Sequence, residues 1–299
     1  MMQKFPDSAR VQLWGARAID RIIHNAGFGG FQIAARELGR AGACEAVAAA
    51  SDAYRQVASV QQAALEAAGA LVYKLACNWQ RFNAAGLCPS VVASMREHAF
   101  NSDIQLCGAC IIEYILDLTA SVGEATEHVA AKNSLMSARA DSVLLRALQN
   151  HRRDPLIVCA RLDAVESLAG AWTAAEALAF CTAGGAQAVV AFLDAHSFDR
   201  NVRTQSLSAL TTLIDGDVCG GNAVTAQFLA AGAIAAVTAL LRTIPLTCGQ
   251  AVLASMRCHV LQHTAPQYSW WRRAQRSKRW RLHERIPGQN CALEAPLRA

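Results

Sequence analysis

The chain has 299 residues, of which 53% are apolar and 17% are charged, which is enough apolar material for a continuous core. No stretch of about 18 or more residues is uniformly apolar, and the N-terminus lacks the apolar segment of a signal peptide. We therefore expect no transmembrane segment and a soluble, cytoplasmic protein, with a nuclear location left open.

Alanine dominates the apolar residues and aromatic residues make up only 6%, which favours closely packed helices over sheets. The 11 cysteines are an odd number, and several fall inside apolar helical runs. This pattern suits small buried side chains in a reducing compartment better than a disulfide framework.

The first predicted element is a long helix from Val11 to His24. Gly27-Phe28-Gly29-Gly30 follows and is expected to form a loop. A turn at Ala41-Gly42 then precedes a helix near Cys44 to Tyr54 and a longer one near Val60 to Leu75. The array therefore begins in mid-unit, so the chain is expected to be either capped there or a fragment of a longer array.

The next units repeat this order. Pro89 lies in the tolerated first turn of a helix that begins near Leu87, and Asn101-Ser102-Asp103 is a capping signal before Ile104. Asp154-Pro155 has the same role before Leu156, and Asn201 before Val202. Residues 123–133 and 215–222 are predicted to be loops or short first helices of the units that they begin.

Two features recur in fixed phase along the chain. Five long-helix stretches begin at Val11, Val60, Ile104, Leu156 and Val202. A glycine, or Ala138 in one degenerate unit, lies 18 residues before four of them, and valine follows each such residue five positions later. A period in the forties is typical of a helical solenoid. The predicted units lie near 11–25, 41–76, 84–118, 126–170, 182–215 and 230–256.

These marks resemble armadillo repeats, most clearly from Ala183 to Leu193 and from Asn201 to Leu210. The resemblance implies an all-α, right-handed α-solenoid of about five stacked helical repeats over residues 1–256. It also implies a protein-binding scaffold that uses its concave face. Family members that grip extended peptides, such as importin-α, carry Trp at the seventh and Asn at the eleventh position of the long helix.

No such ladder exists in this chain. Counted from the five starts, the seventh positions are Arg17, Glu66, Cys110, Leu162 and Ser208, and the eleventh are Arg21, Ala70, Tyr114, Glu166 and Thr212. Helical spacing still places them on one stripe, which is expected to change from basic to acidic along the array. The candidate partner-binding residues are Arg17, Arg21, Glu66, Tyr114, Asp117, Glu166, Thr212 and Asp215. A plain solvated face is the alternative interpretation of these charges.

The last 43 residues, 257–299, differ in composition from the array. They carry nine Lys and Arg against two Glu, which leaves 19 basic and 21 acidic residues before them. From Ser269 to Arg281, Trp and basic residues are interleaved, a pattern compatible with binding to nucleic acid or an anionic membrane. The favoured interpretation is a disordered, solvated tail or a mis-assigned coding segment.

No motif predicts an enzyme, a cofactor or a small-molecule substrate. Cys107 and Cys110 lack a second pair for a zinc site, and packing accounts for their spacing. Cys258, His259 and His263 could meet one metal ion, but a metal site is not the favoured interpretation. The sequence therefore predicts a non-enzymatic protein-interaction scaffold, with nucleic-acid or membrane binding through the tail as the alternative.

Overall fold

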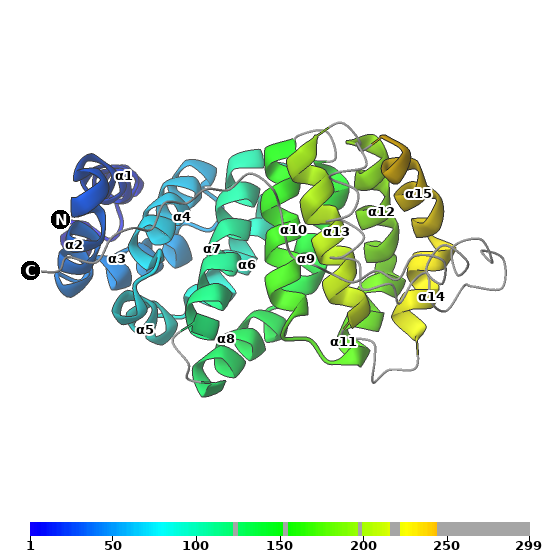
Figure 1. The fold of residues 1–299 in the computed structure, drawn as a ribbon. Helices are drawn as coiled ribbons and strands as arrows, with labels where there is room; N and C mark the ends of the chain where they lie inside the picture. The colour runs from blue at the N-terminus through cyan, green and yellow to red at the C-terminus, as the bar shows by residue number, and fades with distance from the viewer. Residues whose placement is uncertain (122–124, 152–154, 197–198, 216–221, 244–299) are drawn as a thin grey trace, which may run out of the picture. The chain divides into compact units, whose positions relative to one another are not determined.

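The computed structural model describes residues 1–121, 125–151, 155–196, 199–215 and 222–243 (Figure 1). Every regular element in this part of the chain is a helix. All of these residues belong to one unit, Met1–His259, of the two into which the chain divides. The end of the last predicted unit, residues 244–256, and the basic tail lie outside the described residues.

The helices follow a three-helix period after a short 3-10 turn, η1 (Met2–Lys4), and a long helix, α1 (Ala9–Asn25). The full repeats are α2 (Gly27–Arg40), α3 (Ala43–Ala53) and α4 (Ala58–Val72); α5 (Ala76–Ala84), α6 (Leu87–Glu97) and α7 (Ser102–Ser121); α8 (Ala125–Ser137), α9 (Ala140–Asn150) and α10 (Pro155–Ala169); and α11 (Ala174–Phe180), α12 (Ala186–Ala195) and α13 (Arg200–Asp215). The third helix of each full repeat, α4, α7, α10 or α13, is the longest of its repeat. A π-helical turn, η2 (Cys181–Gly185), joins α11 to α12, and α14 (Ala223–Ala230) and α15 (Ala233–Thr243) follow.

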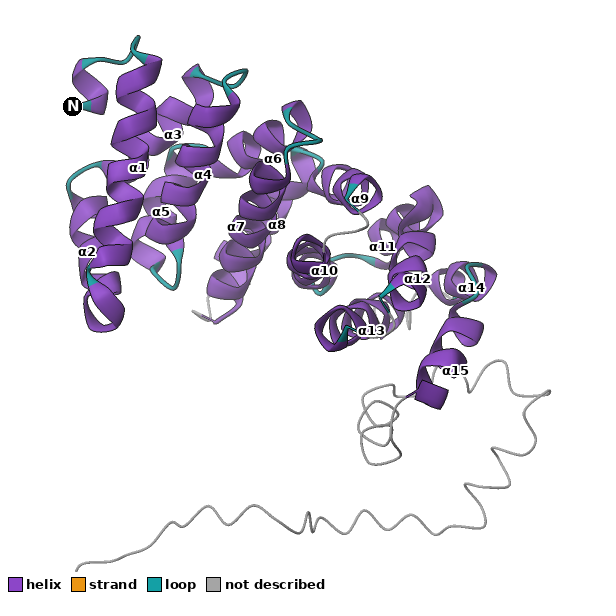
Figure 2. Ribbon diagram, turned by 90° about the horizontal axis from the view of Figure 1, so that it is seen from above, coloured by secondary structure: helices purple, strands orange, loops and turns teal. Residues whose placement is uncertain are grey.

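The long helices stack on one another in chain order, with α1 against α4, α4 against α7, α7 against α10 and α10 against α13. Figure 2 shows them from above, as successive neighbours along the array. The prediction of an all-α solenoid is confirmed. We call the surface formed by α1, α4, α7, α10 and α13 the long-helix face.

The prediction of a loop at Gly27–Gly30 is wrong, because this segment is the first turn of α2. Glycine costs about 1 kcal/mol relative to alanine inside a helix, so composition alone favours a loop there. Packing makes this segment helical instead, since α2 contacts α1, α3 and α4. Each full repeat therefore has a first helix that the two-helix description of the unit near 41–76 omitted.

The left-handed turn before each second helix explains the recurring glycine. Gly42, Gly86, Gly184 and Gly232 all have positive φ, between 77° and 109°. In the degenerate unit the left-handed residue is Arg139, with a φ of 68°, and not Ala138. The alignment through Ala138 is therefore wrong by one residue, and the long helix α10 starts its equivalent stretch at Ile157 instead of Leu156.

Buried glutamines fix the long helices to the turn that precedes them. The Nε2 atoms of Gln12, Gln61 and Gln105 each donate to two backbone carbonyls, ten and seven residues earlier, at 2.7–3.1 Å. These bonds satisfy carbonyls at the end of a preceding helical segment, which would otherwise be costly to bury. In α10 the equivalent position is Val158, and the buried Arg161 donates instead to the carbonyl of Ala147 at 2.9 Å.

Of the four predicted helix starts, two are confirmed and one is wrong, and the fourth depends on Asp154, which lies outside the described residues. Asn101 caps α7, because its Oδ1 accepts from the Ile104 amide at 3.1 Å, and Pro89 lies in the first turn of α6. Asn201 lies inside α13, where Asp199 is the cap that accepts from the amides of Asn201 and Val202. The carboxylate of Asp199 reaches more of the free amides than the side chain of Asn201 could.

One described stretch, Ala174–Ala195, is long and apolar enough to cross a membrane by composition. It comprises α11 and α12 with the left-handed Gly184 between them, and 56% of its most apolar window is buried inside the array. The bent pair α14 and α15 passes the same test only when its two helices are taken together. These properties are those of core helices, and no clear transmembrane segment is found in the described residues.

Candidate protein-binding groove

All the predicted partner-binding residues lie on long helices. Arg17 and Arg21 are exposed on α1, and Glu66 is half-buried on α4. Tyr114 is half-buried and Asp117 exposed on α7, while Glu166 is half-buried on α10. Thr212 is half-buried and Asp215 exposed in the last turn of α13. Their role in binding remains a prediction.

The one-residue shift at Arg139 changes which residues of α10 face outward. Leu162, counted as a seventh position, is fully buried, so its expected place on the stripe is wrong. Asp163 is the true equivalent of Glu66 and Cys110, and it is half-buried. Ser167 is the equivalent of Tyr114, and its Oγ donates to Asp117 on α7 at 3.2 Å. Glu166 still lies between α10 and α13, because Ser208 donates to it at 2.7 Å.

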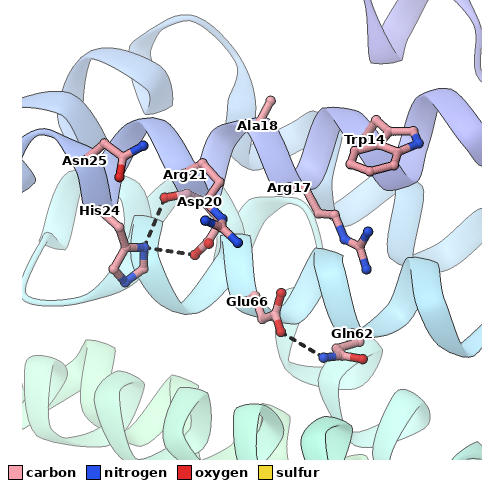
Figure 3. A pocket seen from close by; sticks show the side chains of 9 residues that line it. All are labelled: Trp14, Arg17, Ala18, Asp20, Arg21, His24, Asn25, Gln62 and Glu66. Carbon is pink, nitrogen blue, oxygen red and sulfur yellow. Dashed lines mark hydrogen bonds and ion pairs between the residues drawn. The ribbon is translucent and has the colours of Figure 1, made fainter.

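A first hollow lies between α1 and α4 (Figure 3). Arg17, Arg21 and His24 come from α1, and Glu66 comes from α4, where Gln62 donates to it at 2.9 Å. Neither arginine has an ion pair among the described residues; Arg17 lies over the ring of Trp14, with 5.1 Å between its Cζ and the ring centre. The structure thus brings three predicted residues, Arg17, Arg21 and Glu66, to one place.

A second hollow, of about 420 Å³, adjoins the first and is mostly apolar. Aromatic rings cross it in a chain of edge-to-face contacts. The ring centres are 5.5 Å apart for His24 and Phe31, 6.1 Å for Phe31 and Tyr73, and 5.0 Å for Tyr73 and Tyr114. Leu65 and Leu106 also line it. The hollow shares His24 and Glu66 with the first one.

A third hollow continues the groove from Tyr73 and Tyr114 to Lys74, Glu113 and Asp117. Burial, followed by the nearby carboxylates of Asp163, Asp117 and Glu166, raises the pKa of Glu113 to about 7. Burial, followed by Glu166 and Asp117, likewise raises the pKa of Asp163 to about 6. Four carboxylates of α7 and α10 therefore crowd one end of the groove, and we call Glu113, Asp117, Asp163 and Glu166 the acidic end.

Sequence reasoning missed Phe31, Tyr73, Glu113 and Asp163. Phe31 belongs to α2, which was predicted to be partly a loop, and Asp163 was hidden by the register shift. Tyr73 had a signal, because it lies 13 residues after Val60, as His24 does after Val11 and Asp117 after Ile104. A count of the fourteenth position in each stretch would have added Tyr73 and His24 to Asp117, which was already a candidate.

Cys107 and Cys110 line the second hollow from α7. Burial raises the pKa of the Cys107 thiol to about 12 and that of Cys110 to about 11, and nearby carboxylates add to both shifts. Both sulfurs are therefore thiols near neutral pH, which makes them poor nucleophiles and poor metal ligands. Among the described residues, no group of three or more His, Cys, Asp or Glu could hold a metal ion. Cys258, His259 and His263 lie outside those residues.

Comparisons by sequence find no relative: no family model matches the chain, and no curated protein matches it. Solved structures do match its fold. The designed armadillo repeat protein YIII(Dq)4CqI has a TM-score of 0.63 at 18% identity, over 85% of this chain and 98% of its own. The chain has an armadillo-like helical repeat fold.

Two further structures agree with this armadillo-like fold. An engineered protein has a TM-score of 0.63 at 18% identity, over 86% of this chain and 91% of its own. The designed armadillo repeat protein YIII(Dq.V1)4CPAF, solved in complex with the peptide (KR)4, has a TM-score of 0.60 at 17% identity, over 81% of this chain and 90% of its own. At these identities the likeness concerns the fold alone.

Proposed function

We propose that the chain is a non-enzymatic interaction scaffold that binds an extended segment of a partner protein along its long-helix face. The observation that carries this proposal is the continuity of the groove. Its first two hollows share His24 and Glu66, and its last two share Tyr73 and Tyr114, so one guest can contact α1, α4 and α7 together. The peptide complex of a designed armadillo repeat protein supports the same use of the fold.

The chemistry of the groove supports recognition through side chains. At the eleventh position of successive long helices stand Arg21, Ala70, Tyr114, Ser167 and Thr212, so no repeated Asn is available to hold a peptide backbone. A partner would instead be selected by how its own side chains match the hollows. The protonated thiols of Cys107 and Cys110 support a binding role over a catalytic one. A cytoplasmic location, which the cysteine content favours, is part of the proposal.

The test is co-purification from a cell lysate with the full chain as bait. Tyr114→Ala and Glu166→Gln remove two groove side chains and are expected to reduce recovery of a specific partner. Asp194→Asn is the matched control, because Asp194 is exposed on α12, outside the long-helix face. Partners that are recovered equally with all variants would show that this surface is not the binding site.

A further inference from the structure

The groove changes chemistry along its length, and this change specifies a guest more closely than the fold does. At the α1 end both signs of charge are present, but they are not equally accessible. Asp20 is largely buried and lies 3.0 Å from the Nδ1 of His24, and Glu66 accepts from Gln62. Arg17 and Arg21 are exposed and have no carboxylate partner among the described residues. An incoming guest therefore meets two guanidinium groups one helical turn apart, a geometry suited to a carboxylate.

The middle of the groove is mostly apolar, and its charged lining residues, Asp20 and Glu66, are those that it shares with the first hollow. Phe31, Leu65 and Leu106 line it together with the contacting rings of Tyr73 and Tyr114. A side chain that enters this hollow of about 420 Å³ exchanges water for apolar surface. Only an apolar or aromatic side chain gains from that exchange, since a polar one would lose hydrogen bonds to water.

The acidic end carries an excess of negative charge. Four carboxylates of α7 and α10 lie near one another, and Lys74 lines the third hollow with two of them, Glu113 and Asp117. The ammonium of Lys74 lies 5.2 Å from the centre of the Tyr73 ring and forms no ion pair among the described residues. A guest cation placed here would relieve repulsion among the four carboxylates.

We propose that the groove binds one extended peptide segment with three chemistries in order: an acidic residue at α1, an apolar residue at Tyr73 and Tyr114, and Lys or Arg at the acidic end. The inference rests on the proposed function and names its class of ligand. Neighbouring helices pack about 8–10 Å apart, so the span from α1 to between α7 and α10 is about 20–25 Å. An extended chain covers that distance in roughly six to eight residues.

The test measures the affinity of labelled synthetic peptides for the full chain by fluorescence anisotropy. The matching peptide is about eight residues long and has two Glu at one end, Leu at its centre and two Lys at the other. A second peptide has the same composition with its Glu and Lys residues alternating, and a third replaces Glu by Lys throughout. We expect the matching peptide to bind at least tenfold more tightly than the alternating one.

Variants at the two ends of the groove then test which end binds the acidic residues of the peptide and which end binds the basic ones. Arg17→Glu combined with Arg21→Glu is expected to weaken the matching peptide at least tenfold and to leave the all-Lys peptide bound as well or better. Glu113→Gln combined with Asp163→Asn is expected to weaken both peptides. Arg36→Glu and Asp194→Asn are control substitutions of the same two kinds, since both residues are exposed and lie on α2 and α12, outside the three hollows. Circular dichroism of each variant checks that the fold is kept.

The outcomes separate this inference from the proposal on which it rests. Equal binding of the matching and alternating peptides, both weakened by Tyr114→Ala, would overturn the order of chemistries and keep the groove as a binding site. No binding of any peptide, together with unchanged partner recovery by the groove variants, would overturn both. Loss of the all-Lys peptide in the Arg17→Glu and Arg21→Glu variant would also contradict the assignment of charges.

Discussion

The two ends of the groove are built from equivalent positions of the same kind of helix, yet they present opposite chemistry. Position seven is Arg17 on α1 but Asp163 on α10, and both lie on the long-helix face. Backbone stacking is the same at both ends, so the fold does not require the difference. At the α1 end two exposed arginines accompany two partnered carboxylates, whereas at the acidic end four carboxylates crowd one another, although two of them accept from serines. The two ends therefore differ through single side chains on a shared scaffold.

The largest expected effect is on the free energy of unfolding, and it distinguishes core residues of α10 from groove residues. Leu162 is fully buried and the adjacent Asp163 is half-buried, as the shift at Arg139 requires. Leu162→Ala should lower the free energy of unfolding by about 2–5 kcal/mol, because it removes buried methyl groups and leaves a cavity. Asp163→Ala should not destabilise the protein at neutral pH, because it removes a crowded carboxylate. Urea unfolding of both variants measures the difference, and the reverse order would contradict the register.

A smaller effect should distinguish the two ends of the groove through the pH dependence of peptide affinity. Glu113 and Asp163, whose pKa values are raised to about 7 and about 6, should be ionised near pH 8 and largely protonated near pH 5. A peptide with Lys at its basic end should therefore bind roughly tenfold more weakly at the lower pH. Other titratable or charged groups facing this end are Asp117, Glu166, Lys74, Cys110 and Tyr114. Anisotropy titrations across this range measure the change.

The control for the pH experiment is the chain with Glu113→Gln and Asp163→Asn together. Its affinity for the same peptide should be low and nearly independent of pH, since the two groups that titrate are gone. An equally steep profile in this variant would assign the titration to other groups, including the peptide itself.

The smallest expected effect is on stability. The pKa of Glu113 is higher in the folded chain than its ordinary value, so the folded state retains a proton that the unfolded state releases. Its contribution to stability should therefore fall as pH rises from about 4 through about 7. Glu113→Gln should raise the Tm by about 1–3 °C near pH 8 and leave it nearly unchanged near pH 4. Calorimetry at the two pH values measures this, and a destabilised variant at pH 8 would show that ionised Glu113 has a favourable partner.

The sequence predicts much of this fold because the long helices repeat two local signals. The turn glycine and the apolar run after it placed α3 and α4 close to their observed bounds, and α6, α7 and α13 close to their observed starts. The stripe of outward positions followed from helical spacing, which is why Arg17, Arg21, Glu66 and Tyr114 were found. These features depend on residues near one another in the chain.

The rest depended on contacts that local patterns do not encode. Gly27 to Gly30 became helical through packing against α1 and α4, and this helix carries Phe31 into the groove. Arg139 adopted a left-handed conformation that favours glycine, so the alignment through Ala138 misplaced Leu162. The acidic end arises only where α7 and α10 meet. Each of these features depends on how two segments of the chain pack together.

The most direct test of the account is to map where a bound peptide lies. The matching peptide would carry a photoreactive group in place of its central Leu, and the cross-linked full chain would be digested and analysed by mass spectrometry. The account predicts cross-links to the lining of the middle hollow, in the segments that contain Phe31, Tyr73 and Tyr114. Cross-links concentrated on α3, α6, α9 or α12 would place the guest among the second helices and contradict binding on the long-helix face.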